Sequence, residues 1–201
     1  MRAVREQDWD WLWVTDGRER VGKTAFSTLV LLTAEPEIHE AVLGADYSIA
    51  LSRYSWDFDD MLDTVQNLTP GSALCYQEAS MLGREAMRTW NLRMVRVMST
   101  IGSRNILYLL TFPRFSMLDP YLRWRTRSRT YVRTHRGVRG WARCYYRARA
   151  ETDGDDGLRY AFDTMFRDPA KCLPELWAKL REKEDAVKGA ILSRHGHRSP
   201  E

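Results

Sequence analysis

Gly17-Arg18-Glu19-Arg20-Val21-Gly22-Lys23-Thr24 is the stretch of this sequence that decides the fold. It matches the phosphate-binding loop pattern G-x-x-x-x-G-K-[ST] at every specified position. The mostly apolar residues before it, Trp11–Thr15, predict a buried strand, and Lys23–Thr33 predicts a helix that opens directly out of the loop. Strand, loop and helix in this order give the motif its meaning and indicate an α/β fold. The alternative is a glycine-containing turn that matches by chance.

The loop predicts a nucleotide site. Glycines let the backbone fold round a triphosphate, so that N–H groups and the helix N-terminus point at negative charge. We expect Lys23 to reach the β- and γ-phosphates and the Thr24 hydroxyl to hold Mg²⁺, which makes ATP and Mg²⁺ the predicted cofactors. The predicted nucleotide contacts are Gly17, Arg18, Glu19, Arg20, Val21, Gly22, Lys23, Thr24 and Ala25.

Composition suits one α/β domain with a terminal appendage. The chain has 201 residues, of which 44% are hydrophobic and eight are tryptophan, so it can bury a substantial core. No apolar run approaches the roughly 20 residues of a membrane span. The charged N-terminus does not resemble a signal peptide, and we expect a cytoplasmic protein. Three widely spaced cysteines, Cys75, Cys144 and Cys172, predict a reducing compartment without a disulfide framework or zinc site.

Positive charge is concentrated in one segment. The net charge is +4, yet the residues from Arg114 to Arg149 include eleven arginines, one acid and no lysine, so they carry +10 and the rest of the chain −6. Local basic charge among aromatic residues is typical of a nucleic-acid surface, and duplex DNA is the predicted partner. Alternatively, these arginines are solvated or pair with acids of an adjacent subunit. The predicted DNA contacts are Arg125, Arg127, Arg129, Arg133, Arg136 and Arg139.

Ser72–Glu78 predicts a short buried strand that ends in an acid. P-loop enzymes place their Walker B element on such a strand, where a carboxylate faces Mg²⁺ or the attacking water. We therefore expect this strand to be adjacent to the one that feeds the loop, with Glu78 polarising the water and both Gln77 and Glu78 near the metal. Gln77 stands where Asp is usual, and a neutral amide can orient a metal-bound water but cannot neutralise the ion. The alternative for Glu78 is an ordinary polar strand end.

Other segments predict the surrounding elements. Asn105–Thr111 predicts a strand buried on both faces, and Thr111 at its tip is either a γ-phosphate sensor or a capping or turn residue. Tyr47–Leu51 predicts a strand. Asp57–Leu62 predicts a helix start, with acids placed for the helix dipole rather than for a metal. Met81–Gly102 predicts a long helix with one apolar face.

The C-terminal half predicts a hairpin and a helix. Arg129–His135 and Gly140–Arg149 alternate as strands around a short glycine-containing connection. Asp153–Gly157 predicts a flexible acidic loop and Pro174–Leu192 an amphipathic helix. The predicted organisation is a P-loop core over residues 1–150, the acidic loop and helix over 151–193, and a flexible tail over 194–201.

The order of motifs resembles the P-loop ATPases of the FtsK/HerA group, and it is closest to zonular-occludens-toxin-like and viral genome-packaging members. In those proteins the third core strand also runs into a Pro-containing turn and a Leu-Asp-x-x-x-Arg-like segment before a final hairpin. The likeness covers about residues 11–149, and after the apolar strand it is carried by Phe112-Pro113-Arg114-Phe115-Ser116-Met117-Leu118-Asp119-Pro120-Tyr121-Leu122-Arg123.

The resemblance implies a RecA-like fold, with a mainly parallel central sheet flanked by helices, a C-terminal β-hairpin and a terminal helix. It also implies a homo-oligomeric ring, ATP hydrolysis and DNA translocation. By position, Lys23 and Thr24 bind phosphate and Mg²⁺, Glu78 is the catalytic acid and Thr111 occupies the sensor position, where other members often have an amide. A neighbouring subunit is expected to supply an arginine, and the candidates are Arg104, Arg114 and Arg123.

Two hypotheses follow. The first is an ATP-hydrolysing motor subunit that translocates double-stranded DNA, as in packaging a viral or plasmid genome. The second is a nucleotide-binding module for DNA binding or assembly with little or no turnover, which Gln77 favours. A small-molecule kinase ranks last because the sequence after Thr111 contains no recognisable lid.

Overall fold

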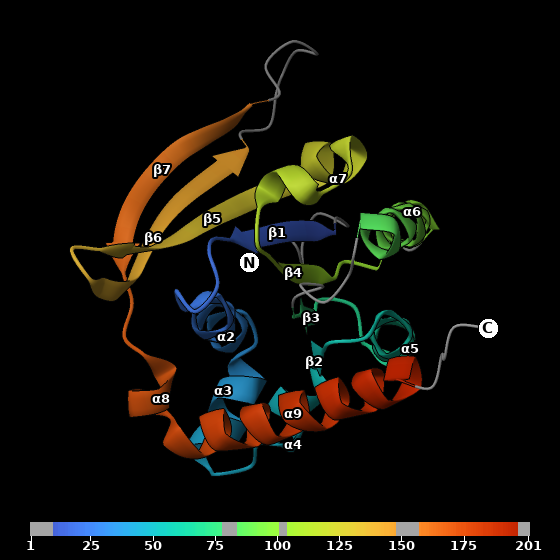
Figure 1. Ribbon diagram of the computed structural model, residues 1–201. Coiled ribbons are helices and arrows are strands. Elements are labelled where there is room, and N and C mark those ends of the chain that lie inside the picture. Colours follow the sequence, from blue (N-terminus) through green and yellow to red (C-terminus); the bar gives the residue numbers. More distant parts are fainter. Residues whose placement is uncertain (1–9, 78–83, 101–103, 148–156, 197–201) are drawn as a thin grey trace.

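A seven-stranded sheet forms the centre of the computed structural model in Figure 1, which describes residues 10–77, 84–100, 104–147 and 157–196. The strand order is β2-β3-β4-β1-β5-β6-β7. The first five strands in this order run parallel, and β6 and β7 follow as antiparallel strands. The strands are β1 (Trp11–Asp16), β2 (Tyr54–Ser55), β3 (Ala73–Tyr76), β4 (Leu107–Phe112), β5 (Thr126–His135), β6 (Val138–Arg147) and β7 (Leu158–Met165).

Helices cover both faces of the parallel strands (Figure 1). On one face α5 (Phe58–Asn67), α6 (Arg84–Thr100) and α7 (Pro120–Arg125) pack on alternate strand residues such as Leu12 and Val14. On the other face lie α2 (Lys23–Ala34), α3 (Pro36–Leu43), α4 (Ser48–Ser52) and α9 (Pro174–Gly196). Two short helices, η1 (Phe115–Met117) and α8 (Pro169–Cys172), lie in connections. This mixed α/β architecture is consistent with a RecA-like fold.

β4 is the middle one of the five parallel strands, and all six of its residues are buried. It pairs in parallel with β1 on one side and with β3 on the other. The prediction that β3 is adjacent to β1 is therefore wrong, because the continuously apolar β4 takes the place between them. The carboxyl ends of β1, β3 and β4 nevertheless lie at the same edge of the sheet.

The predicted strand Tyr47–Leu51 is also wrong, because the chain forms helix α4 there. The Asp46 carboxylate accepts hydrogen bonds from the Ser48 backbone N–H at 2.9 Å and from the Ser48 hydroxyl at 2.6 Å. An Asp that bonds to the backbone two residues on favours a turn into a helix over an extended strand. The acids at the start of α5 do cap a helix, since the Asp57 side chain accepts from the N–H groups of Asp59 and Asp60.

The C-terminal hairpin is confirmed and is larger than predicted. β5 and β6 meet at Arg136 and Gly137, which both have positive φ, at 49° and 78°, as a two-residue hairpin turn requires. β7 then adds a third antiparallel strand that the sequence did not predict. The acidic segment 153–156 lies outside the described residues, while α9 continues to Gly196, into the predicted tail. In the described part of the chain, no helix is long and apolar enough to cross a membrane.

A buried ion pair joins the end of β1 to β5. The Asp16 carboxylate accepts two hydrogen bonds from the Arg129 guanidinium, at 2.8 and 2.9 Å, and one from the Phe115 backbone N–H at 3.2 Å. Asp16 is only 3% exposed and directly precedes Gly17. The pair therefore fixes the point at which the chain leaves the sheet and enters the loop.

Removing the arginine leaves a buried carboxylate without its main partner, which is strongly destabilising. We expect Arg129→Ala to lower the free energy of unfolding by about 3 kcal/mol, at the low end of the usual range because Arg129 is partly exposed. Arg136→Ala, at the exposed hairpin turn, is the matched control and should change it by less than about 0.5 kcal/mol. Urea unfolding measures the free energy of unfolding of both variants. If the two variants lost the same amount, the Asp16–Arg129 ion pair would not be what holds this end of β1.

Candidate nucleotide site

The glycines of the loop occupy positions that other residues do not fit. Gly17 has φ 151°, and a Cβ there would lie 2.2 Å from the backbone oxygen of Val132. Gly22 has φ 105° and packs against the ring of Phe166, which would lie 3.4 Å from a Cβ. The loop thus lies tightly against β5 at Gly17, whereas at Gly22 it is in ordinary van der Waals contact with the chain after β7 and the positive φ favours glycine. The specified glycines of the motif are required by this backbone path.

The N-terminus of α2 is available to an anion. Its N-cap is Gly22, which has no side chain to accept from the first N–H groups of the helix. α5 and α7 differ, because Asp57 and Asp119 cap them with carboxylates. Uncapped N–H groups together with the helix dipole make a helix start attractive to phosphate.

Lys23 holds the loop in its curved shape. Its ammonium donates to the backbone oxygens of Gly17 at 3.0 Å and Arg18 at 3.3 Å, and the residue is 5% exposed. The ammonium thus lies inside the loop, where a bound phosphate would also meet it. Contact of Lys23 with the β- and γ-phosphates stays a prediction.

Thr24 and Gln77 are in contact across the top of β4. The Thr24 hydroxyl donates to Oε1 of Gln77 at 2.9 Å, and Nε2 of Gln77 donates to the sulfur of Cys75 at 2.9 Å. Burial raises the pKa of the Cys75 thiol to about 12, so the sulfur stays neutral. Gln77, at 2% exposure, is therefore held with its amide oxygen toward Thr24.

The Thr24 hydroxyl keeps its lone pairs free of that bond, because it is the donor. Those lone pairs and the phosphate oxygens are the hard ligands that Mg²⁺ prefers, and Mg²⁺ usually keeps several waters as well. Within the described residues there is no cluster of three or more His, Cys, Asp or Glu side chains that could hold a metal. Glu78, which the sequence also predicts near the metal, lies outside these residues.

The structure places the other predicted site residues at different depths. Thr111 lies at the end of β4 but is only 1% exposed, and its hydroxyl is 3.5 Å from that of Ser27 beneath the loop. It is not among the described residues that line the cavity at the loop. Glu78, the predicted catalytic acid, lies outside the described residues, so its role stays a prediction.

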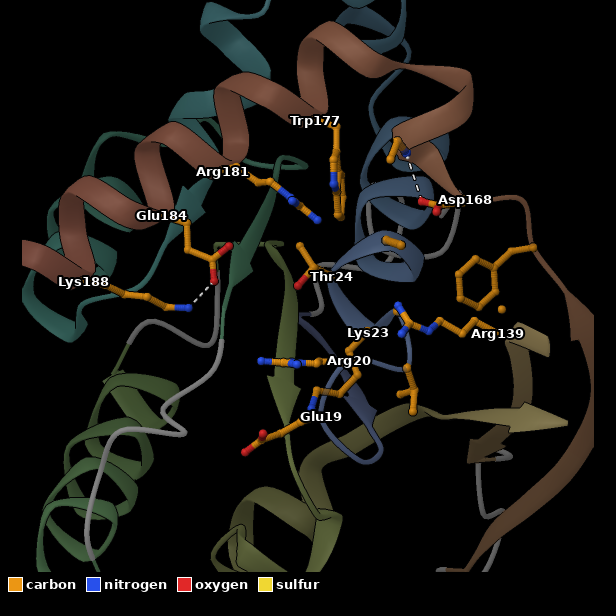
Figure 2. A pocket seen from close by; sticks show the side chains of 16 residues that line it. Glu19, Arg20, Lys23, Thr24, Arg139, Asp168, Trp177, Arg181, Glu184 and Lys188 are labelled. Atoms are coloured by element: carbon orange, nitrogen blue, oxygen red, sulfur yellow. Dashed lines mark hydrogen bonds and ion pairs between the residues drawn. The ribbon is translucent and has the colours of Figure 1, made fainter. Parts of the chain in front are cut away.

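A cavity of about 550 Å³ opens beside the loop (Figure 2). One wall is the loop and the start of α2, which contribute residues from Glu19 to Ala25. The hairpin and the chain after β7 add Arg139, Gly140, Phe166 and Asp168, and α9 adds a further wall. The cavity residues on α9 are Trp177, Arg181, Glu184 and Lys188.

Sequence reasoning missed this second wall. It predicted an amphipathic helix over Pro174–Leu192, outside the P-loop core, and did not place it at the loop. The only signal in the sequence was that Trp177, Arg181 and Lys188 each directly follow an apolar residue at helical spacing. That spacing cannot by itself reveal which part of the fold the helix faces.

The three candidate arginines for a neighbouring site lie in two places. Arg114 is exposed and follows β4, at the edge of the sheet where the loop lies. Arg104 precedes β4 at the opposite edge, where its guanidinium donates to the backbone oxygens of Val65, Gln66 and Leu68. Arg123 lies in α7, just before β5, also at that opposite edge. Within its own chain, only Arg114 of the three lies at the edge of the candidate site, and a role in a neighbouring subunit stays a prediction.

Several arginines predicted to bind DNA are engaged within the protein. Arg129 is held by Asp16, and Arg125 donates to the Met98 backbone oxygen and to the Tyr121 hydroxyl. Arg133 lies 3.6 Å from Asp163, and Arg127 is half-buried on the same side of β5. Arg136 is exposed at the hairpin turn, and Arg139 lines the cavity. The basic segment thus serves the fold as well as the surface.

Comparisons with known proteins leave the family of this chain open. No protein-family profile matches the sequence. No curated protein matches it either. Among solved structures it is similar to the crystal structure of the N-terminal domain of zonular occludens toxin from Neisseria meningitidis, with 12% identity and a TM-score of 0.43, over 82% of this chain and 98% of that one. A likeness this distant does not establish a family.

The close approach of Gly17 to β5 gives a direct test of the loop. Gly17→Ala should lower the free energy of unfolding by about 2 kcal/mol or more, because the new methyl group meets backbone and φ is unfavourable for alanine. Gly189→Ala is the control, since Gly189 lies within α9 with open space around it. There alanine should stabilise by about 0.5–1 kcal/mol. Thermal or urea unfolding of both variants measures these changes. If Gly17→Ala left the free energy of unfolding unchanged, the close approach of the loop to β5 would be wrong.

Proposed function

We propose that this protein binds ATP with Mg²⁺ at the Gly17–Thr24 loop and hydrolyses it. The observation that carries the proposal is the hydrogen bond from Thr24 to Gln77, at the start of a helix whose N-terminus has no side-chain cap. It brings the loop hydroxyl and the end of a second parallel strand together beside the cavity, as a phosphate and metal site requires.

Catalysis by such a site is mainly positioning and charge stabilisation. The α2 N-terminus and Lys23 would hold the β- and γ-phosphates, and Thr24 would ligate Mg²⁺. The amide of Gln77 would fix the Thr24 hydroxyl and orient a metal-bound water. Glu78, next in the chain, would polarise the attacking water.

The second candidate is a nucleotide-binding module with little turnover, and Gln77 is the observation that favours it. The amide is buried and bonded on both sides, so it supplies no negative charge to the metal. A site without that charge binds Mg²⁺ mainly through the nucleotide. Binding can then be retained while hydrolysis is slow.

Measuring ATP binding and Mg²⁺-dependent hydrolysis by the purified protein separates the candidates. If the protein hydrolyses ATP, Lys23→Ala should abolish both binding and turnover. Glu78→Gln should lower turnover by about 100-fold or more without loss of ATP binding. Gln77→Asp should tighten Mg²⁺ binding in the presence of ATP, because it adds a charge beside Thr24. Binding without turnover, unaffected by Glu78→Gln, supports the module. Failure to bind ATP would reject both.

We also propose that the protein acts on duplex DNA as one subunit of a homo-oligomeric ring, and that the outer face of β5–β7 contacts the DNA. This outer face is the side turned away from α2, since Val132, Ala142 and Cys144 point toward α2. It carries the alternate residues, among them Arg127, Arg133 and Arg143, together with Tyr131 and Tyr145. In the described part of the chain, no helix covers this side of β6 and β7 (Figure 1). Contacts between such a face and the phosphate backbone of DNA do not depend on the base sequence, which suits a translocating motor.

A salt titration of duplex DNA binding tests that face. Replacing Arg133 and Arg136 with Ala should weaken binding and reduce the slope of log K against log salt by about 0.9 for each lost phosphate contact. Lys171→Ala removes an exposed positive charge on α8, away from the outer face, and should leave the slope unchanged. If the double variant and the control have the same slope, these arginines do not touch DNA.

A further inference from the structure

The C-terminal helix α9 is fixed against the core by a regular set of residues. Leu176 and Leu180 are 1% and 3% exposed and pack with α2, α3 and α4. Lys183 donates to the backbone oxygens of Leu51 at 2.9 Å and Tyr54 at 2.8 Å, and Val187 packs against the same cluster. These four positions set the rotation of α9 about its axis.

Each anchor is followed directly by a residue that lines the cavity. Trp177, Arg181, Glu184 and Lys188 come one position after the anchors and form a stripe on the neighbouring side of the helix. One residue turns an α-helix by about 100°, so a helix anchored in this way presents that stripe to the loop. In Figure 2 the guanidinium of Arg181 points from α9 toward Thr24.

We propose that α9 forms the second wall of the nucleotide site, and that Arg181 contacts the terminal phosphates of ATP bound to the loop of the same chain. This inference rests on the proposed nucleotide binding. It assigns to the chain itself a positive group that the sequence alone led us to expect from a neighbouring subunit.

The charges around the cavity fit a polyphosphate. The lining includes five basic side chains, Arg20, Lys23, Arg139, Arg181 and Lys188, against three acidic ones, Glu19, Asp168 and Glu184. Lys188 pairs with Glu184 one helical turn away, which leaves Arg181 as the more suitable group on α9. Its guanidinium is exposed, with its central carbon 6.0 Å from the centroid of the Trp177 ring.

The chemistry of arginine suits this role. A guanidinium presents a planar fork of N–H donors that matches two oxygens of a phosphate. A cation–π contact with the Trp177 ring, at 6.0 Å, attracts the guanidinium without using its donors. Arg181 approaches from the side of the cavity opposite the loop, so it would contact the terminal phosphates of ATP. It would therefore contribute less to the binding of a diphosphate.

Calorimetric titration of the 201-residue chain with MgATP and MgADP tests the assignment. Arg181→Ala should weaken MgATP binding by about tenfold or more, the effect of losing a charged hydrogen bond, and MgADP binding by less. Arg181→Lys should recover part of the loss because it retains the charge. Lys179→Ala, which removes a positive charge from α9 outside the cavity, should change neither affinity by more than about twofold.

The outcomes distinguish this inference from the function it rests on. If the wild-type protein binds MgATP and Arg181→Ala binds it as tightly as Lys179→Ala does, α9 does not contact the phosphates and the inference is overturned. If Arg181→Ala weakens MgATP and MgADP equally, the terminal phosphate is not its partner and the inference is again wrong. If the wild-type protein binds neither nucleotide, the proposed function fails first. A thermal melt of each variant confirms that the exposed substitutions leave the fold intact.

Discussion

The parallel pairing of β4 with β1 on one side and β3 on the other is the constraint on which the candidate site depends. It brings the carboxyl ends of three strands to one edge of the sheet, where ligands bind in open α/β proteins. Thr24 can then reach Gln77 although 53 residues separate them in the chain. The Asp16–Arg129 pair adds β5 to this arrangement, so the loop starts from a fixed position.

The cavity is built from both ends of the chain. The loop and α2 come from its beginning, whereas Arg139, Phe166 and the α9 stripe come from its second half. β7 leads the chain back past the loop, and Phe166 directly after it contacts Gly22. A nucleotide in this cavity would touch segments that the sequence assigns to separate parts, and its binding would connect them.

Local sequence signals predicted the elements that depend on local chemistry. The glycines and Lys23 define the loop, continuous apolar residues define β4, and Arg136-Gly137 makes a hairpin turn. Elements that depend on distant partners were missed. β7 is an exposed strand held by pairing with β6, and Tyr47–Leu51 has strand-like residues that Asp46 turns into a helix. Arg129 looked like a DNA contact because no sequence pattern reveals that Asp16, 113 residues away, binds it.

The central claim is that a triphosphate lies between the loop and α9, with Mg²⁺ on Thr24. A crystal structure of the protein with Mg²⁺ and a non-hydrolysable ATP analogue tests it most directly. We predict phosphate oxygens at the N–H groups of the α2 N-terminus and at Lys23, and a Mg²⁺ ion within about 2.1 Å of the Thr24 hydroxyl oxygen. An analogue bound elsewhere, or a loop left empty at saturating concentration, would contradict the account.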